Sequence, residues 1–117
     1  MSYVDGWVAA VPNENKEKYL EHAKRAAKVF KKHGALTYVE NWGDQVPEGE
    51  VTSFPMAVKA KEGETVVFSW ITWASRDVRN EGMQKAMEDP EFKMGMGDMP
   101  FDGKRLIFGG FETVLNE

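Results

Sequence analysis

Three carboxylates lie in strand-like stretches that are rich in aromatic residues, and these side chains are well suited to acid–base chemistry. Asp5 shares one face of an alternating stretch with Trp7, Glu40 shares another with Trp42, and Glu112 lies in the last such stretch. A carboxyl group in apolar surroundings, or beside a second carboxylate, has a raised pKa and can act as a general acid or base. We therefore predict Asp5, Glu40 and Glu112 as candidate catalytic residues.

Aromatic and basic side chains in the same stretches could hold a ligand. Trp7, Trp42 and Trp70 are large apolar side chains that could line a cavity beside a sheet. Arg105 follows the Asp102-Gly103 turn signal and could bind an anionic group, or it could fix Asp102 by a bidentate hydrogen bond. We predict Trp7, Trp42, Trp70 and Arg105 as ligand-binding residues.

The composition excludes several other chemistries. The chain has no Cys, which excludes disulfides, thiolate metal sites and thiol catalysis. Its two His residues, His22 and His33, are eleven positions apart on one predicted helix and therefore about 16 Å apart along its axis. They cannot share a metal ion, and their charged neighbours indicate surface positions. We expect neither a metal nor a cofactor.

Charge and hydropathy limit the partners. The net charge of -4 argues against a dedicated nucleic-acid binder. The first predicted helix is nevertheless basic, with seven cationic side chains: Lys16, Lys18, Lys24, Arg25, Lys28, Lys31 and Lys32. This face could contact RNA, or it is an ordinary solvated helix face. No apolar run approaches the roughly 18 residues of a membrane span, and the first residues lack signal-peptide features. We expect a cytoplasmic protein without membrane contact.

Periodicity predicts the elements that position these side chains. Period-two stretches predict strands over 3–11, 36–42, 54–59, 65–73 and 104–115, and a longer period predicts helices over 14–33 and 76–88. Asp89-Pro90 predicts the start of a further short helical segment. The order is β-α-β-β-β-α-β, and the chain of 117 residues fits one domain over 1–117. We predict an α+β fold with a ferredoxin-like antiparallel sheet and two helices on one face.

This order predicts how the carboxylates lie relative to one another. The first and last strands would be antiparallel neighbours, which brings Asp5 toward Glu112. The second strand would lie two positions from the first, so about 10 Å separates Glu40 from Asp5. Glu40 could then line the same cavity without sharing a proton. The alternatives are that these carboxylates lie at the sheet rim in water, or that Asp5 is paired with a basic group.

Apolar residues on both faces of the predicted strands indicate a second chain. In the stretch 65–73, Ile71 and Trp73 lie on one face while Phe68 and Trp70 lie on the other. Two helices cover only one face, and monomers rarely expose more than a few hundred Å² of contiguous apolar surface. We therefore predict a homodimer formed by packing of the sheet faces. The alternative is that the loops at 43–53 and 95–103 cover the second face.

Seven segments of the chain resemble the YbaA-like family of small bacterial proteins of unknown function: 3–8, 34–36, 39–42, 56–60, 66–71, 99–105 and 109–112. The Met-Pro-Phe-Asp-Gly-Lys-Arg stretch at 99–105 is the most specific of them. The resemblance implies a dimeric α/β-barrel of ferredoxin-like type. It implies no agreed activity and no agreed catalytic residues.

Three functions follow as hypotheses. The first is the binding of a small aromatic or lipophilic metabolite in a cavity beside the sheet. The second is a cofactor-independent enzyme, monooxygenase- or isomerase-like, that uses a pocket carboxylate as its base. The third is association with RNA through the basic first helix, in which case affinity would fall steeply with salt.

Overall fold

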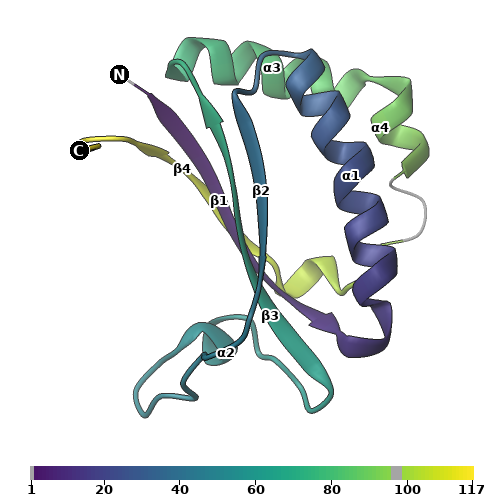
Figure 1. Cartoon of the computed structure of the whole chain (residues 1–117), viewed down its shortest axis with the longest axis vertical. Helices are drawn as coiled ribbons and strands as arrows, with labels where there is room; N and C mark the ends of the chain where they lie inside the picture. The colour runs from purple at the N-terminus through teal and green to yellow at the C-terminus, as the bar shows by residue number, and fades with distance from the viewer. Residues whose placement is uncertain (1, 96–98) are drawn as a thin grey trace.

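The computed structural model describes residues 2–95 and 99–117, which form one antiparallel sheet with helices on it (Figure 1). The strands are β1 (Tyr3–Pro12), β2 (Thr37–Trp42), β3 (Glu64–Trp73) and β4 (Ile107–Glu112). The α-helices are α1 (Lys16–Lys32), α2 (Phe54–Ala57), α3 (Arg76–Glu88) and α4 (Pro90–Gly95). Short 3₁₀ turns, η1 (Asn13–Asn15) and η2 (Gly103–Arg105), precede α1 and β4. Within the described residues, no helix is both long enough and apolar enough to cross a membrane.

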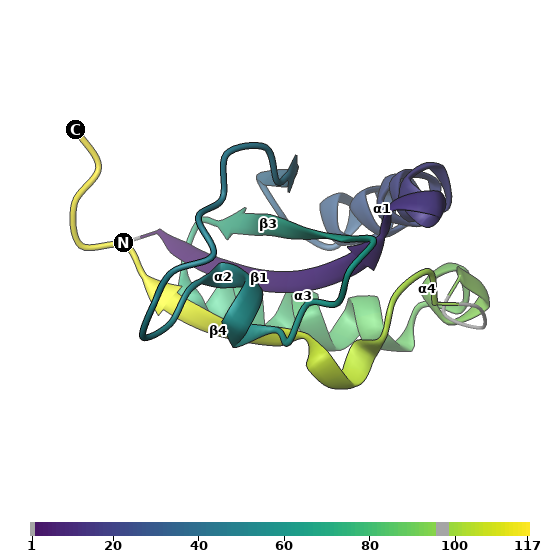
Figure 2. The ribbon, with the colours of Figure 1, turned by 90° about the horizontal axis from the view of Figure 1, so that it is seen from below.

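The sheet has the strand order β2-β3-β1-β4, and its pairings are antiparallel. The predicted neighbourhood of the first and last strands is confirmed, and β2 lies two positions from β1 as expected. Figure 2 shows the residues after β4 leaving the sheet beside the start of β1, where the Thr113 N–H donates to the Ser2 carbonyl. The register sets each side chain on a defined face, because cross-strand partners point the same way.

One face of the sheet is covered by α1, α3 and α4. Its core joins Phe30 of α1 and Ala86 of α3 to Ile71 and Trp73 of β3. The predicted helix at 76–88 is confirmed, and the Ser75 side chain caps it by accepting from the Val78 N–H at 3.2 Å. The apolar stripe of α1 faces the same core, which the spacing of its alanines and aromatics predicts.

The opposite face carries a helix where a strand was expected. The prediction of a strand over 54–59 is wrong, because α2 forms there and the sheet has four strands rather than five. Ser53 accepts a hydrogen bond from the Met56 N–H at 3.1 Å, and a proline lies in the first turn. Both are helix-start signals that outweigh the strand-like alternation. Beyond α2, Val58 is fully buried against Val8 and Val66.

The last strand is also shorter than predicted. β4 begins at Ile107, and Arg105 lies in η2 rather than at a strand start. Residues 96–98 of the predicted covering loop lie outside the described residues. Its described part holds Met99 and Phe101, which line the helix side of the sheet rather than the open face. The predicted covering loop at 43–53 lies beside Val66 of this face, and α2 packs Phe54 against Phe68.

Candidate functional site

A cavity of about 500 Å³ lies between the helix-covered face of the sheet and the helices above it. Its floor comes from all four strands, its roof from α1, α3 and α4, and one wall from the chain before β4. The lining is mostly apolar and includes Ala26, Phe30, Ile71, Met83, Met87, Phe92, Met99, Phe101, Leu106 and Phe108. The polar lining residues are Asp5, Trp7, Tyr19, His22, Tyr38, Glu40 and Arg79.

Glu40 is the centre of a hydroxyl cluster in this cavity. The Tyr19 hydroxyl donates to its Oε1 at 2.7 Å, and the Tyr38 hydroxyl donates to its Oε2 at 2.9 Å. The Ser69 hydroxyl donates to Oε1 as well. Ser69 is the register partner of Glu40 on β3, and Tyr38 is two residues away on the same strand face. The Trp7 Nε1–H lies 3.5 Å from the Tyr19 oxygen and extends the cluster onto β1.

Both phenols of the cluster keep their protons. Burial, and then the charge of Glu40, raises the pKa of Tyr19 and of Tyr38 well above the ordinary tyrosine value. The two hydroxyls are therefore fixed as donors to the carboxylate at neutral pH. Among the described residues Glu40 makes no ion pair, so it is a carboxylate held entirely by neutral donors.

Asp5 has a different environment, because a cation is bound to it. Arg79 of α3 donates from Nε at 3.0 and 3.1 Å and from Nη2 at 2.7 Å, and the Trp73 Nε1–H donates at 2.9 Å. The Asp5 side chain is 11% exposed. This is the pairing with a basic group that the sequence left open, and it ties α3 to the first strand.

Glu112 does not join Asp5 in a carboxylate pair. It lies opposite Tyr3 in the register and is exposed, while Gly110 lies opposite Asp5. The structure thus brings Asp5 and Glu40 to one cavity and leaves Glu112 at the sheet rim.

Of the four predicted ligand-binding residues, only Trp7 lines this cavity. Trp42 lies beside it under Lys16, whose Nζ is 5.0 Å from the ring centroid. Trp70 is on the opposite face of the sheet, where its ring lies 5.4 Å from that of Phe68. The single-strand alternation could not show that β3 sends Trp70 away from the side that carries the helices.

Arg105 is bound by the protein itself. Its Nη1 and Nη2 atoms donate to the two Glu64 oxygens at 2.7 and 2.8 Å, and Nε donates to Asp102 at 3.1 Å. Nη1 also donates to the Lys59 carbonyl at 2.8 Å. The guanidinium lowers the pKa of Glu64, and the two carboxylates raise the pKa of Arg105. The expected contact with Asp102 forms, and the guanidinium anchors η2 to β3 instead of facing a cavity.

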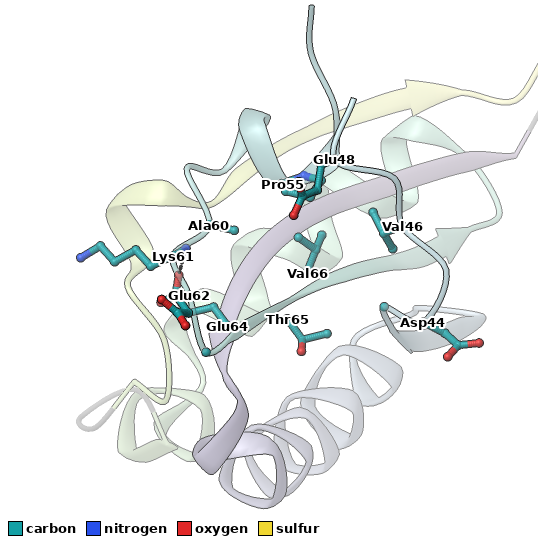
Figure 3. Close-up of a pocket in the computed structure, with 12 residues that line it drawn as sticks. Asp44, Val46, Glu48, Pro55, Ala60, Lys61, Glu62, Glu64, Thr65 and Val66 are labelled. Carbon is teal, nitrogen blue, oxygen red and sulfur yellow. Dashed lines mark hydrogen bonds between the residues drawn. The ribbon is translucent and has the colours of Figure 1, made fainter. Parts of the chain in front are cut away.

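A second hollow of about 530 Å³ lies between the loop after β2 and the turn before β3 (Figure 3). Figure 3 shows Val46 and Val66 at its centre, with Lys61 and Asp44 directed away from each other at the two ends. No predicted site residue lines this hollow. Its charged side chains are mostly exposed, so it offers weaker recognition than the helix-side cavity.

Sequence reasoning missed five polar residues of the cavity and of its hydroxyl cluster: Tyr19, His22, Tyr38, Ser69 and Arg79. Tyr19 lies in the apolar stripe of α1, which predicts a core position, and His22 is half-buried although its charged neighbours predict the surface. Tyr38 lies two residues before Glu40 on the same face of one strand, so the strand period could have placed its hydroxyl beside the carboxylate. Within residues 2–95 and 99–117, no group of three or more His, Asp or Glu side chains could hold a metal ion.

Solved structures share this fold at low sequence identity. A point mutant of SnoaB from Streptomyces nogalater, described as a cofactor-independent oxygenase, matches with a TM-score of 0.56 and 12% identity, over 98% of this chain and 95% of that one. Rv0793 from Mycobacterium tuberculosis matches with a TM-score of 0.54 and 12% identity, over 100% and 98% of the two chains.

Relatives in sequence are much closer. The "Uncharacterized protein YbaA" of Escherichia coli K12 is 55% identical over 117 residues, covering the whole of both chains, and the same holds for that of Shigella flexneri. The family model "Protein of unknown function (DUF1428)" matches residues 2–103. The chain therefore belongs to the DUF1428 family of proteins of unknown function, to which it is related along most of its length.

Proposed function

We propose that the protein binds a small aromatic or lipophilic molecule in the helix-side cavity. The observation that carries this proposal is an apolar cavity of about 500 Å³ with a hydroxyl–carboxylate cluster at one end. Small-molecule sites are typically apolar hollows of this size in which a few polar groups fix the orientation of the ligand. Met83, Phe30 and Phe101 supply apolar contacts, and Trp7 and Tyr38 supply aromatic faces.

Filling the cavity tests the proposal. In Met83→Trp the larger side chain would occupy space that the ligand needs, whereas Met56→Trp makes the same exchange on exposed α2, outside the cavity. We expect 1-methylnaphthalene to shift the NMR signals of Trp7 and Ile71 in the parent protein and in Met56→Trp. Those shifts should be lost in Met83→Trp. Equal shifts in a folded Met83→Trp protein would place the probe elsewhere and contradict the proposal.

A second candidate function is cofactor-independent enzyme chemistry with Glu40 as the base. The observation that favours it is the Glu40 carboxylate, which hydroxyl groups hold inside an apolar cavity and which no described cation contacts. Such a group could remove a proton from an acidic O–H or C–H group, and the resulting substrate anion could itself supply electrons to oxygen. The fold likeness to SnoaB, described as a cofactor-independent oxygenase, is consistent with this candidate.

Oxygen uptake distinguishes the enzyme from the binding protein. We expect an enzyme to consume oxygen with at least one member of a panel of polyhydroxylated aromatic compounds. Removing a general base costs on the order of 10² to 10⁴ in rate, so Glu40→Gln should lower that uptake by at least about 100-fold. Uptake that is unchanged in Glu40→Gln would exclude Glu40 as the base.

We also propose that the working unit is a ferredoxin-like homodimer formed through the open sheet face. On this face Phe68 is 48% exposed, Ile107 44% and Phe111 62%, and all three point away from α1, α3 and α4. A second copy of the same face would remove them from water, as the predicted dimeric barrel requires.

A further inference from the structure

We propose that the ligand of the helix-side cavity is an amine in its cationic form, with its ammonium group at Glu40 and an apolar body extending over Trp7 toward β4. This inference rests on the proposed binding function and names the class of ligand. It follows from the charges, the aromatic faces and the length of the cavity.

The charges that line the cavity, among the described residues, leave Glu40 without a counter-ion. Asp5 and Arg79 neutralise each other through three hydrogen bonds. Burial and the neighbouring Arg25 lower the pKa of His22, which disfavours the cationic form of this side chain. The donors at Glu40 are hydroxyl groups, which stabilise the carboxylate without cancelling its charge. A charge in apolar surroundings is strongly favoured to acquire a counter-ion.

The geometry around Glu40 suits a cation. A carboxylate has about four acceptor positions, and three hydroxyls occupy three of them. The rings of Trp7 and Tyr38 lie with their centroids 5.6 Å apart beside this group. Both rings meet the cluster through their polar edges, so their apolar surface is left for the body of the ligand behind its charged head. A neutral hydroxyl would leave the charge uncancelled, and an anionic group would be repelled.

The register gives the direction of the apolar body. Phe108, Trp7, Ser69 and Glu40 form one row across β4, β1, β3 and β2. Three strand spacings place Phe108 about 14 Å from Glu40. Phe108 is 80% exposed, so this end of the row opens to solvent. A ligand that enters there and reaches Glu40 is elongated and apolar behind its charged head.

Three probes of the same shape test the inference: 1-naphthylmethylamine, 1-naphthalenemethanol and 1-naphthoate. Titration calorimetry at pH 7 should show the amine binding at least roughly ten-fold more tightly than the alcohol, with the acid weakest. In Glu40→Gln the amine should lose this preference. Glu112→Gln removes one carboxylate at the sheet rim and should leave the preference unchanged. Binding of 1-naphthalenemethanol to Glu40→Gln, as in the parent, shows that this variant keeps a folded cavity.

The outcomes separate the two proposals. If the alcohol binds as tightly as the amine, and Met83→Trp abolishes both, the cavity binds ligands but the amine inference is wrong. If the amine binds equally well to Glu40→Gln, its cation does not lie at Glu40 and the inference is also wrong. If all three probes bind to Met83→Trp as tightly as to the parent, or if none of them binds to the parent, the proposed binding function fails and the amine inference fails with it.

Discussion

Two carboxylates in one cavity have opposite surroundings, and this difference separates their roles. Asp5 accepts hydrogen bonds from the Arg79 guanidinium and from the Trp73 indole N–H, so a cation of the same chain neutralises its charge. Glu40 receives hydroxyl groups, and its charge is left for a ligand or a reacting proton. Both carboxylates lie among aromatic residues on one face of an alternating strand, so the sequence pattern alone predicts similar surroundings for them. Their surroundings differ because Arg79, which is far from Asp5 in sequence, pairs with Asp5.

Asp5→Asn should destabilise the protein without abolishing the cavity. The amide keeps the size of the side chain but leaves Arg79 without its counter-charge beside the core. Removing one partner of a largely buried ion pair is strongly destabilising, so we expect a loss of about 2 kcal/mol or more in the free energy of unfolding. Urea denaturation measures this loss. Glu81→Gln is the control, because its pair with Lys85 is on the surface of α3 and should have no measurable effect. Equal stability of Asp5→Asn and the parent would show that the pair does not tie α3 to β1.

At the scale of elements, Asp89 joins α1 to the junction of α3 and α4. Its Oδ2 is 2.8 Å from His33 Nε2 and 3.2 Å from Lys32 Nζ, and its Oδ1 accepts from the Glu91 N–H at 2.9 Å. The hydrogen bond to His33, followed by that from Glu91, lowers the pKa of Asp89 to about 2. One carboxylate thus caps α4 and neutralises the basic end of α1.

The Asp89 contacts predict a specific acid sensitivity. Because the folded pKa of about 2 is below the ordinary value of 3.8, the stabilisation is fully present above pH 4 and is lost as the pH falls toward 2. Melting temperatures of the parent and Asp89→Asn should therefore differ at pH 6 and converge near pH 2. Comparing the two proteins removes the effect of other acids that they share. A difference that is constant from pH 6 to pH 2 would contradict an ionic role for Asp89.

Gly82 sets how closely α3 approaches the sheet. A Cβ added there would lie 2.5 Å from the Trp73 ring and would also clash with the His33 carbonyl. Alanine is the better helix former, yet Gly82→Ala should destabilise the protein by about 2 kcal/mol because the packing must shift. Chemical denaturation checks this value, with Gly103→Ala as the control, since a Cβ at that position meets nothing within 4 Å. A stabilised Gly82→Ala protein would show that helix propensity dominates.

The sequence predicts an element well where its capping residues and its hydrophobic period indicate the same structure. The Ser75 cap, the apolar stripe of α1 and the alternation of β1 and β3 each point to one structure. At 54–57 alternation favoured a strand while the Ser53 cap and Pro55 favoured a helix, and the capping signals prevailed. Local rules of similar strength compete in short segments, so such segments are the least predictable.

At the scale of the whole molecule, the part of the site that the sequence did not predict is the part that depends on distant contacts. Asp5 pairs with Arg79 across 74 positions, and Tyr19 reaches Glu40 across 21. Periodicity places a residue on a face but does not say which helix residue lies above it. The strand faces of Asp5 and Glu40 were therefore predictable, whereas the cation on one and the hydroxyls on the other were not.

At the scale of the whole molecule, the apolar side chains on the open sheet face predict that two copies pair through this face. Phe111 is exposed on this face next to Val4, whereas Phe108 is on the same strand but faces the helix side. We expect light scattering at micromolar concentration to give twice the chain mass of 13.3 kDa for the parent. Phe111→Glu places a charge in the apolar interface and should give monomers. Phe108→Glu adds the same charge away from that face and should remain dimeric. A monomeric parent, or a dimer that survives Phe111→Glu and dissociates in Phe108→Glu, would show that the sheet face is not where two copies meet.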